Sequence, residues 1–490
     1  MQIAVKPEEC IRVVKAVLVV SVVVMTAFVA GCGGGGDSSS PSSSNSSSGS
    51  NGNSSASNGS TSNGSASNGN PSNGNSSDSN TGSSTGSGTT GNSTGGSTGT
   101  GTGIGNGNGN NNSGPSQQPI AANAPNTVAV TVDRGVANII NIPTISVTVC
   151  APNSTTNCTT IDHVLLDTGS FGLRVVNSAL GSLANSLPIQ QATAGGQLVE
   201  CTHFADGFSW GTTRTATVKI SGEVANNIPI QVIGDLPDST IPGDCVNGAA
   251  ENTAQSLGAN GIIGIGVAPV DCGAACSVQG NVAQFSSYYA CQNGTNCTRT
   301  LAEMSKQVAN PVPNFPVDNN GVIVQMAPIS SSGAVFATGT VVFGIGTQSN
   351  NGNAAATTYT TDASGDLVNS QFNGTKTSAF MDSGSNAYFF QDNSLLLCGG
   401  SLSSFYCPGT PQQRTVTLVG ANGATGAAAI GIVSAQTLLS SQRNFVFNNL
   451  GGQIGSLTAF DLGLPFFFGR YVYFGMDKRA SGGQAPFAAF

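Results

Sequence analysis

Two short segments of the chain combine the residue types that acid–base chemistry needs. Residues 163–170 and 378–385 each run through three apolar residues into Asp, a hydroxyl residue, Gly and Ser, with the carboxylates at Asp167 and Asp382. One such motif is expected by chance in a chain this rich in Gly, Ser and Thr, but two with matching apolar leaders are not. Each predicts a buried strand that ends in a tight turn and carries a carboxylate out of the core.

A pair of carboxylates supports a definite chemistry. Two such groups a few ångströms apart cannot both ionise comfortably, so they share one proton and titrate as a pair. The ionised member can then act as a base on a trapped water while the protonated member donates to a scissile carbonyl. This chemistry requires no metal, cofactor, nucleophilic serine or histidine, and we predict none at this site.

The elements that must position these carboxylates read as β-strands. Short runs rich in Val, Ile and Thr recur between Gly, Asn and Pro breaks, at residues 127–132, 139–149, 215–220, 228–233, 322–326, 340–343, 415–419 and 471–474. The best helix candidate, residues 301–308 with Thr300 and Glu303 as a capping box, is too short to change the class. The sequence therefore predicts an all-β fold with few short helices.

With these motifs the chain resembles the bilobed pepsin-like aspartic peptidases, in which each lobe contributes one Asp-[Thr/Ser]-Gly turn. The likeness spans nearly all of residues 125–490. Uncharacterised bacterial lipoproteins also resemble the chain, more closely in its N-terminal anchor and tether. The likeness to the peptidases implies two β-barrel-like lobes, expected at residues 119–315 and 316–490, with a cleft between them. Residues 262–264 and 462–463 match the apolar-apolar-Gly element that crosses behind each aspartate turn.

The resemblance also implies roles for the neighbouring residues. Thr168 and Ser383 would lock the two turns together, and Ser170 and Ser385 would hydrogen-bond the outer carboxylate oxygens. The flap hairpin that covers substrate is expected at Trp210, Gly211 and Thr212. The glycines that complete the two turns are Gly169 and Gly384.

The function expected on this basis is an aspartic endopeptidase that acts, as a monomer, on polypeptide substrates. The main alternative is an inactive binding module for peptide, glycan or a protein partner, favoured by the unusual residues Arg174, Trp210 and Thr213. A serine esterase is also conceivable because residues 207–211 fit Gly-x-Ser-x-Gly around Ser209. That class needs its histidine after the serine on a helix-rich scaffold, whereas both histidines precede Ser209.

Composition excludes several other classes of protein. The 490 residues contain 15 Lys and Arg against 23 Asp and Glu, a net charge of −8, so nucleic acid is not an expected partner. The only histidines are His163 and His203, which removes most zinc-hydrolase interpretations.

The N-terminal quarter of the chain has the composition of an export signal followed by a tether. Residues 1–31 combine a basic start with a short apolar run, as in an export signal, and residues 29–32 resemble the bacterial lipobox, with lipid expected on Cys32. Residues 32–118 are almost wholly Gly, Ser, Asn and Thr and cannot form a core, so we expect a disordered tether. The prediction is a lipid-anchored protein of the bacterial cell envelope, at the outer membrane.

Ten further cysteines lie in the remaining sequence. An even number in an exported chain predicts disulfides rather than a metal site. Pairing each cysteine with its sequence neighbour gives Cys150–Cys158, Cys201–Cys245, Cys272–Cys276, Cys291–Cys297 and Cys398–Cys407.

Overall fold

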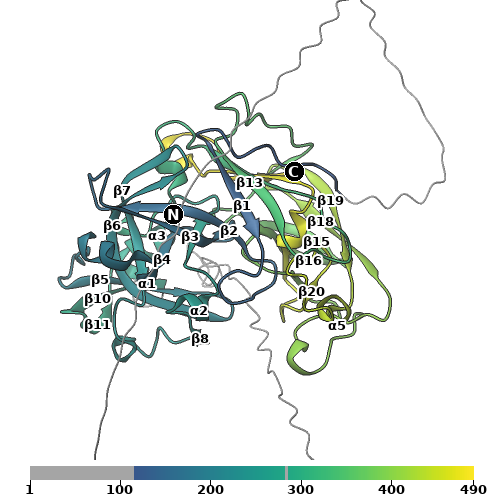
Figure 1. Cartoon of the computed structure of the whole chain (residues 1–490), viewed down its shortest axis with the longest axis horizontal. Coiled ribbons are helices and arrows are strands. Elements are labelled where there is room, and N and C mark those ends of the chain that lie inside the picture. Colours follow the sequence, from purple (N-terminus) through teal and green to yellow (C-terminus); the bar gives the residue numbers. More distant parts are fainter. Residues whose placement is uncertain (1–114, 282–284) are drawn as a thin grey trace, which may run out of the picture. The chain divides into compact units, whose positions relative to one another are not determined.

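The structure, a computed structural model, describes residues 115–281 and 285–490 (Figure 1). These ranges contain 23 β-strands, and the four α-helices defined within them have no more than five residues each. The helices are α1 (Asn177–Leu180), α2 (Ala254–Leu257), α3 (Ala274–Ser277) and α5 (Ala435–Leu439). The all-β class with few short helices that the sequence predicts is confirmed.

The larger sheet has 16 strands and contains both the beginning and the end of the described chain. In spatial order its path is β11 (Thr295–Arg299), β10 (Tyr288–Gln292), β5 (Gln197–His203), β6 (Gly207–Ile220), β7 (Glu223–Ile233), β4 (Phe171–Val176), β9 (Gly261–Ile265), β3 (Cys158–Asp167), β2 (Pro143–Cys150), β1 (Thr127–Val132), β13 (Ala337–Phe343), β12 (Gly321–Met326), β22 (Tyr471–Gly475), β23 (Phe487–Ala489) and β14 (Thr358–Thr360), with β8 (Ala249–Ala250) beside β6.

The second sheet has seven strands and lies wholly in the C-terminal part of the chain. Its spatial order is β19 (Thr425–Ile432), β18 (Gln412–Val419), β15 (Leu367–Phe372), β16 (Thr375–Asp382), β21 (Ala459–Gly463), β17 (Tyr388–Phe390) and β20 (Gly451–Gly452).

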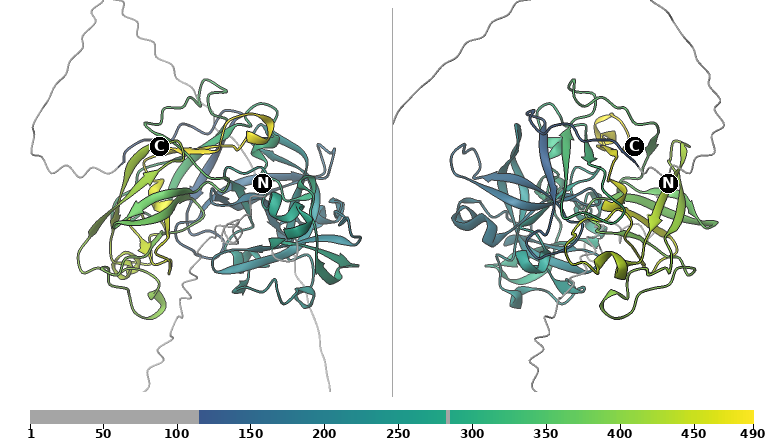
Figure 2. Two further views of the ribbon diagram at one scale, coloured as in Figure 1. Left: turned by 180° about the vertical axis from the view of Figure 1, so that it is seen from behind. Right: turned by 45° about the vertical axis from the view of Figure 1, so that its right-hand side comes forward.

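The division into two lobes at residues 315 and 316 stays a prediction, and one sheet runs across it. Strand β1 pairs along its whole length with β13, and β12 joins β13 to the late strand β22. Figure 2 shows these strands side by side, with the early chain in dark blue and the end of the chain in yellow. The two parts of the chain are therefore joined by backbone hydrogen bonds as well as by side-chain packing.

The two aspartate motifs occupy equivalent places in the two sheets. Strand β3 pairs parallel with β9, which also pairs antiparallel with β4, so that β9 lies between the strands before and after the first turn. Strand β21 lies in the same way between β16 and β17 at the second turn. Residues 262–264 and 462–463 thus cross behind the turns as the sequence predicts.

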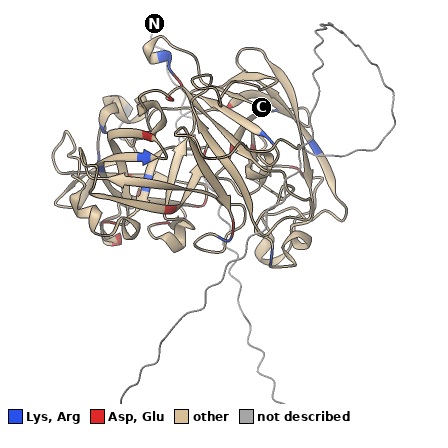
Figure 3. Cartoon of the chain, turned by 45° about the horizontal axis from the view of Figure 1, so that its top comes forward, with Lys and Arg blue, Asp and Glu red and all other residues tan. Residues whose placement is uncertain are grey.

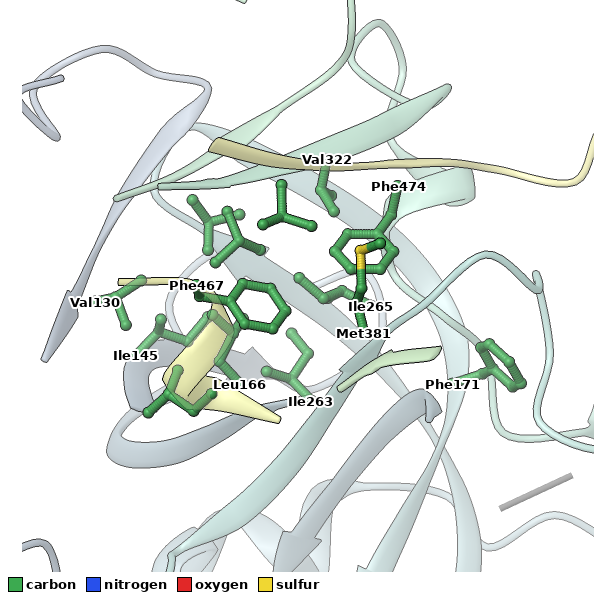
Figure 4. Close-up of a cluster of buried hydrophobic side chains, with 14 of the residues drawn as sticks. Val130, Ile145, Leu166, Phe171, Ile263, Ile265, Val322, Met381, Phe467 and Phe474 are labelled. Atoms are coloured by element: carbon green, nitrogen blue, oxygen red, sulfur yellow. The ribbon is translucent and has the colours of Figure 1, made fainter. Parts of the chain in front are cut away.

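A large buried core holds the strands that lead into both turns. Leu166 and Met381, the residues immediately before the two aspartates, pack in it with Ile263 and Ile265 of β9 (Figure 4). Leu166 and Ile263 are fully buried. Because both leaders are anchored in apolar surroundings, the carboxylates that follow them are held in fixed positions.

The predicted strands all exist, whereas the predicted helix does not. All eight predicted runs overlap observed strands, and β1 has the predicted bounds. Within residues 301–308 only a 3₁₀ turn at Met304–Lys306 forms. The start of that segment is held instead by other backbone, because the amide of Ala302 donates to the carbonyl of Cys276 at 3.0 Å.

The five predicted disulfides are all present: Cys150–Cys158, Cys201–Cys245, Cys272–Cys276, Cys291–Cys297 and Cys398–Cys407.

The predicted export signal and most of the predicted tether lie outside the described residues. The folded region begins slightly before the expected Pro119, since the amide of Gln117 donates to the carbonyl of Gly469 at 2.9 Å. Within residues 115–281 and 285–490, no helix is both long and apolar enough to cross a bilayer. In the view of Figure 3, charged residues are few and scattered over this region.

Candidate active site

The first aspartate turn binds its own carboxylate. Asp167 ends β3, and its Oδ1 accepts a hydrogen bond from the amide of Gly169 at 2.7 Å. Its Oδ2 accepts a short hydrogen bond from the hydroxyl of Ser170. Both oxygens of the carboxylate are therefore oriented by residues of the motif itself.

The second turn repeats this arrangement. Asp382 ends β16, its Oδ1 accepts from the amide of Gly384 at 2.8 Å, and its Oδ2 accepts from the hydroxyl of Ser385 at 3.0 Å. These contacts of Ser170 and Ser385 are those that the resemblance implies. The two carboxylates thus have closely matching local surroundings.

Reciprocal hydrogen bonds join the two turns. The hydroxyl of Thr168 accepts from the amide of Ser383 at 2.9 Å and donates to the carbonyl of Met381 at 3.0 Å. The hydroxyl of Ser383 accepts from the amide of Thr168 at 3.1 Å and donates to the carbonyl of Leu166 at 2.7 Å. Each hydroxyl is both donor and acceptor across the seam, so the separation of the two turns is fixed.

The carboxyl groups of Asp167 and Asp382 meet at this seam and hydrogen-bond to each other. Both residues are fully buried. A Cβ atom placed on Gly169 would lie 2.5 Å from Cγ of Asp382, so only glycine leaves room for the second carboxyl group here.

The surroundings of the pair favour retention of a proton. Burial is the largest influence on Asp167 and raises its pKa, although hydrogen bonds from Asp382, Ser170 and Gly169 act in the opposite direction. Burial, together with the charges of Asp167 and Asp461, holds the pKa of Asp382 well above its usual range. The arrangement can therefore supply one carboxylate and one carboxylic acid at the same place.

A second buried ionic network surrounds Arg174, close to the first turn. Its guanidinium donates to the carbonyl of Phe171 at 2.8 Å, to Glu200 at 2.7 Å and to Asp271 at 3.1 Å. The hydroxyl of Tyr288 also donates to Asp271, at 2.8 Å. Arg174 is 1% exposed, so its charge acts with little screening by water.

A family model described as "Protein of unknown function (DUF3443)" matches residues 122–490. The chain belongs to the DUF3443 family. No curated protein matches it. Among solved structures, that of an aspartic proteinase from Irpex lacteus is similar, with 17% identity, a TM-score of 0.41, and coverage of 74% of this chain and 96% of that one.

The assignment of Trp210, Gly211 and Thr212 to a flap over the site stays a prediction. All three are buried within β6, while the turn between β5 and β6 lies at residues 204–206. The indole of Trp210 packs edge-on against Tyr289 and donates to the hydroxyl of Thr240 at 3.1 Å. A Cβ on Gly211 would lie 1.9 Å from the carbonyl oxygen of Val232, so this glycine permits close strand packing and does not form a turn.

The remaining sequence candidates have structural explanations. Ser209 is fully buried in β6 and donates to Gln231 at 3.2 Å, which does not fit a nucleophile at an exposed elbow. His203 lies 2.8 Å from the carbonyl of Cys245. Cys201, His203 and Cys245 form the one metal-type cluster in the described ranges, but both sulfurs are already joined in a disulfide.

Sequence reasoning missed the charged residues that act on the pair from outside the motifs. Asp461 of β21 is 3% exposed and acts on Asp382, and Glu200 and Asp271 surround Arg174. One signal was available. A charged residue between two apolar ones is rare in so weakly charged a chain, and both Arg174 and Asp461 occur in that context.

Proposed function

We propose that this protein is a membrane-anchored aspartic endopeptidase that hydrolyses peptide bonds with a water activated between Asp167 and Asp382. The observation that carries the proposal is the pair of buried, hydrogen-bonded carboxyl groups on two equivalent turns that Thr168 and Ser383 lock together. A structural role alone does not explain it, because burying two carboxyl groups side by side costs free energy.

The proposed chemistry follows from a single shared proton. The ionised carboxylate removes a proton from water as its oxygen attacks the carbonyl carbon of the peptide bond, and the protonated carboxyl donates to the carbonyl oxygen. The tetrahedral intermediate then breaks its C–N bond as the carboxyl group that took the proton from water passes it to the departing amine nitrogen, and a hydroxyl of the intermediate returns its proton to the other carboxylate. The turn amides and the hydroxyls of Ser170 and Ser385 hold the carboxylates in place throughout.

The test is hydrolysis of a peptide library by the full chain between pH 3 and pH 7. Asp167→Asn and Asp382→Asn should each reduce cleavage to background, and the double variant should be scarcely worse than either single one, because the two carboxyl groups act as a unit. The matched control is Asp238→Asn, an exposed residue far in sequence from both turns. Substantial cleavage by Asp382→Asn, or none by the wild type at any pH, would refute the peptidase assignment.

The second candidate is an inactive binding module, and the packing of Trp210 favours it because its indole is fully buried against Tyr289 in a separate core cluster. A binding module would bind peptide without turnover and would not depend on the shared proton. An inhibitor whose hydroxyl mimics the tetrahedral intermediate separates the two functions. Loss of its binding in Asp167→Asn, with peptide binding retained, supports the peptidase.

The anchor and the location belong to the same proposal. Lipid on Cys32, followed by a tether through residue 118, would hold the folded region near the outer membrane of a bacterial envelope while leaving it room to reach substrates. Cys32→Ser should release the protein from the membrane fraction without changing its activity in solution. Membrane association that survives this substitution would contradict the lipid anchor.

A further inference from the structure

The two carboxyl groups sit on scaffolds that are nearly the same, so the motifs alone do not decide which one keeps the proton. Each carboxylate accepts from a glycine amide two residues later, at 2.7 Å for Asp167 and 2.8 Å for Asp382. Each also accepts from the serine one position further on. A bias between them must therefore come from residues outside the motifs.

The strands that cross behind the turns show where the equivalence ends. In the first sheet, Arg174 of β4 is paired with Ile262 of β9. In the second sheet, the corresponding pair is Phe389 of β17 and Asp461 of β21. At this place in the fold, the first sheet has the cation Arg174 beside an apolar residue. The second sheet has an apolar residue beside the anion Asp461.

Arg174 acts on the first turn through contact and charge. Its Nη1 donates to the carbonyl of Phe171, the residue that directly follows the turn, at 2.8 Å. Burial raises the pKa of Asp167, whereas the hydrogen bonds to it and the positive charge of Arg174 lower that pKa. Arg174 therefore favours a carboxylate at Asp167.

The acids around Arg174 do not outweigh its charge. Burial and then the neighbouring Glu200 hold the pKa of Asp271 well above its usual range, so Asp271 retains its proton. Tyr288 faces the same network, and burial raises its pKa as well, so its hydroxyl stays neutral. With Asp271 and Tyr288 neutral, the network has no net negative charge, and Arg174 is the member that contacts the residue after the first turn.

Asp461 acts on the second turn with the opposite sign. It is 3% exposed, and its register partner in β16 is Phe380, two residues before Asp382. Burial is the largest cause that raises the pKa of Asp382, and the charges of Asp167 and Asp461 follow. Asp461 therefore favours a protonated carboxyl at Asp382.

We propose that Arg174 and Asp461 are positioning residues that place the shared proton on Asp382 and leave Asp167 as the base. This inference rests on the proposed function for its catalytic consequence, but the location of the proton can be measured without any activity. The two charges belong to different sheets and bias the same proton in the same direction. Each is buried, so each acts through a medium that screens it weakly.

The direct test is carbon-13 NMR of the full chain labelled at the aspartate carboxyl carbons, with Asp167→Asn and Asp382→Asn used for assignment. At a pH where the pair holds one proton, we expect the shift of a carboxylate at Asp167 and of a carboxylic acid at Asp382. Asp461→Asn, which keeps the shape of the side chain, should move proton occupancy from Asp382 toward Asp167. Asp366→Asn is the matched control and should leave the occupancy unchanged, since Asp366 is a buried acid that directly precedes β15 and accepts a hydrogen bond from Ser378.

The variants of Arg174 supply the other half of the test. Arg174→Lys keeps the charge and should preserve the bias, whereas Arg174→Gln should raise proton occupancy at Asp167. If Arg174→Gln fails to fold because its acids lose their partner, Asp461→Asn alone still decides the matter. Equal occupancy in the wild type, or an unchanged occupancy in Asp461→Asn, would overturn the proposal.

Activity gives an independent readout and separates this inference from the proposed function. Asp461→Asn should shift the alkaline limb of the kcat/KM profile to lower pH by on the order of one unit, since removing a nearby like charge eases ionisation of Asp382. The NMR bias in a wild-type protein that cleaves nothing would sink the peptidase and leave the inference standing. Cleavage by a wild-type protein in which NMR shows no such bias would support the peptidase and refute this inference.

Discussion

Gly169→Ala is the substitution for which the structure gives the sharpest expectation. The added Cβ would lie 2.5 Å from Cγ of Asp382 and 2.7 Å from each of its carboxyl oxygens, closer than such atoms approach. Asp382 cannot swing away freely, because the amide of Gly384 and the hydroxyl of Ser385 hold its carboxylate at 2.8 Å and 3.0 Å. Either the carboxyl group or one of the turns must therefore move.

The cost of such overpacking is about 1–3 kcal/mol of unfolding free energy. A displacement of the reacting group on the order of 1 Å would also lower kcat/KM by ~100-fold. Urea denaturation followed by circular dichroism measures the first effect, and peptide cleavage measures the second. Gly243→Ala is the matched control, because a Cβ there meets no atom within 4 Å. If Gly169→Ala unfolded at the same urea concentration as Gly243→Ala, the close approach of the two turns would be refuted.

Two further predictions concern residues away from the carboxyl pair. Trp210→Ala should lower the unfolding free energy by about 3–5 kcal/mol, as expected for a buried aromatic residue. Phe336→Ala, at a 61% exposed position, should have little effect. Equal effects of the two substitutions in urea denaturation would contradict the burial of Trp210. Burial and the neighbouring Asp206 raise the pKa of Glu251 to about 9, so the folded state holds a proton that the unfolded state releases above its ordinary pKa. Its contribution to stability should be complete below about pH 4 and should be lost as the pH rises toward about 9, and Glu251→Gln should flatten that part of the pH–stability curve measured by denaturation.

The fold could be predicted from local patterns wherever a strand consists of residues that favour strands. The run at residues 127–132 has the same bounds as β1, because all but one of its residues are Val or Thr, which favour strands. The run at 215–220 is only the last part of β6, which starts at Gly207. A glycine inside a strand looks like a turn in sequence, and only the backbone of β7, far along the chain, reveals why Gly211 is there. The place of Gly211 inside a strand therefore follows from the pairing of β6 with β7 and not from the residues next to it.

The candidate site divides in the same way. The carboxyl pair could be predicted from the repeated motif, and the resemblance implied its hydroxyl contacts, which come from residues within three positions of each carboxylate. The network around Arg174 could not, since Glu200 and Asp271 come from β5 and from a loop after β9. Asp461 acts on Asp382 only because parallel pairing of β16 with β21 brings the two strands together.

In this pseudo-symmetric site, the residues that fix the geometry differ from those that distinguish the two carboxyl groups. The motif fixes geometry with neutral groups, namely the turn amides and the serine and threonine hydroxyls, and these are matched on the two sides. The charged groups that distinguish the sides lie outside the motif, on strands whose pairing is also matched. Geometry and proton placement are thus determined by separate residues. A substitution at Arg174 or Asp461 should therefore change the pH at which the pair works while the two turns keep their shape.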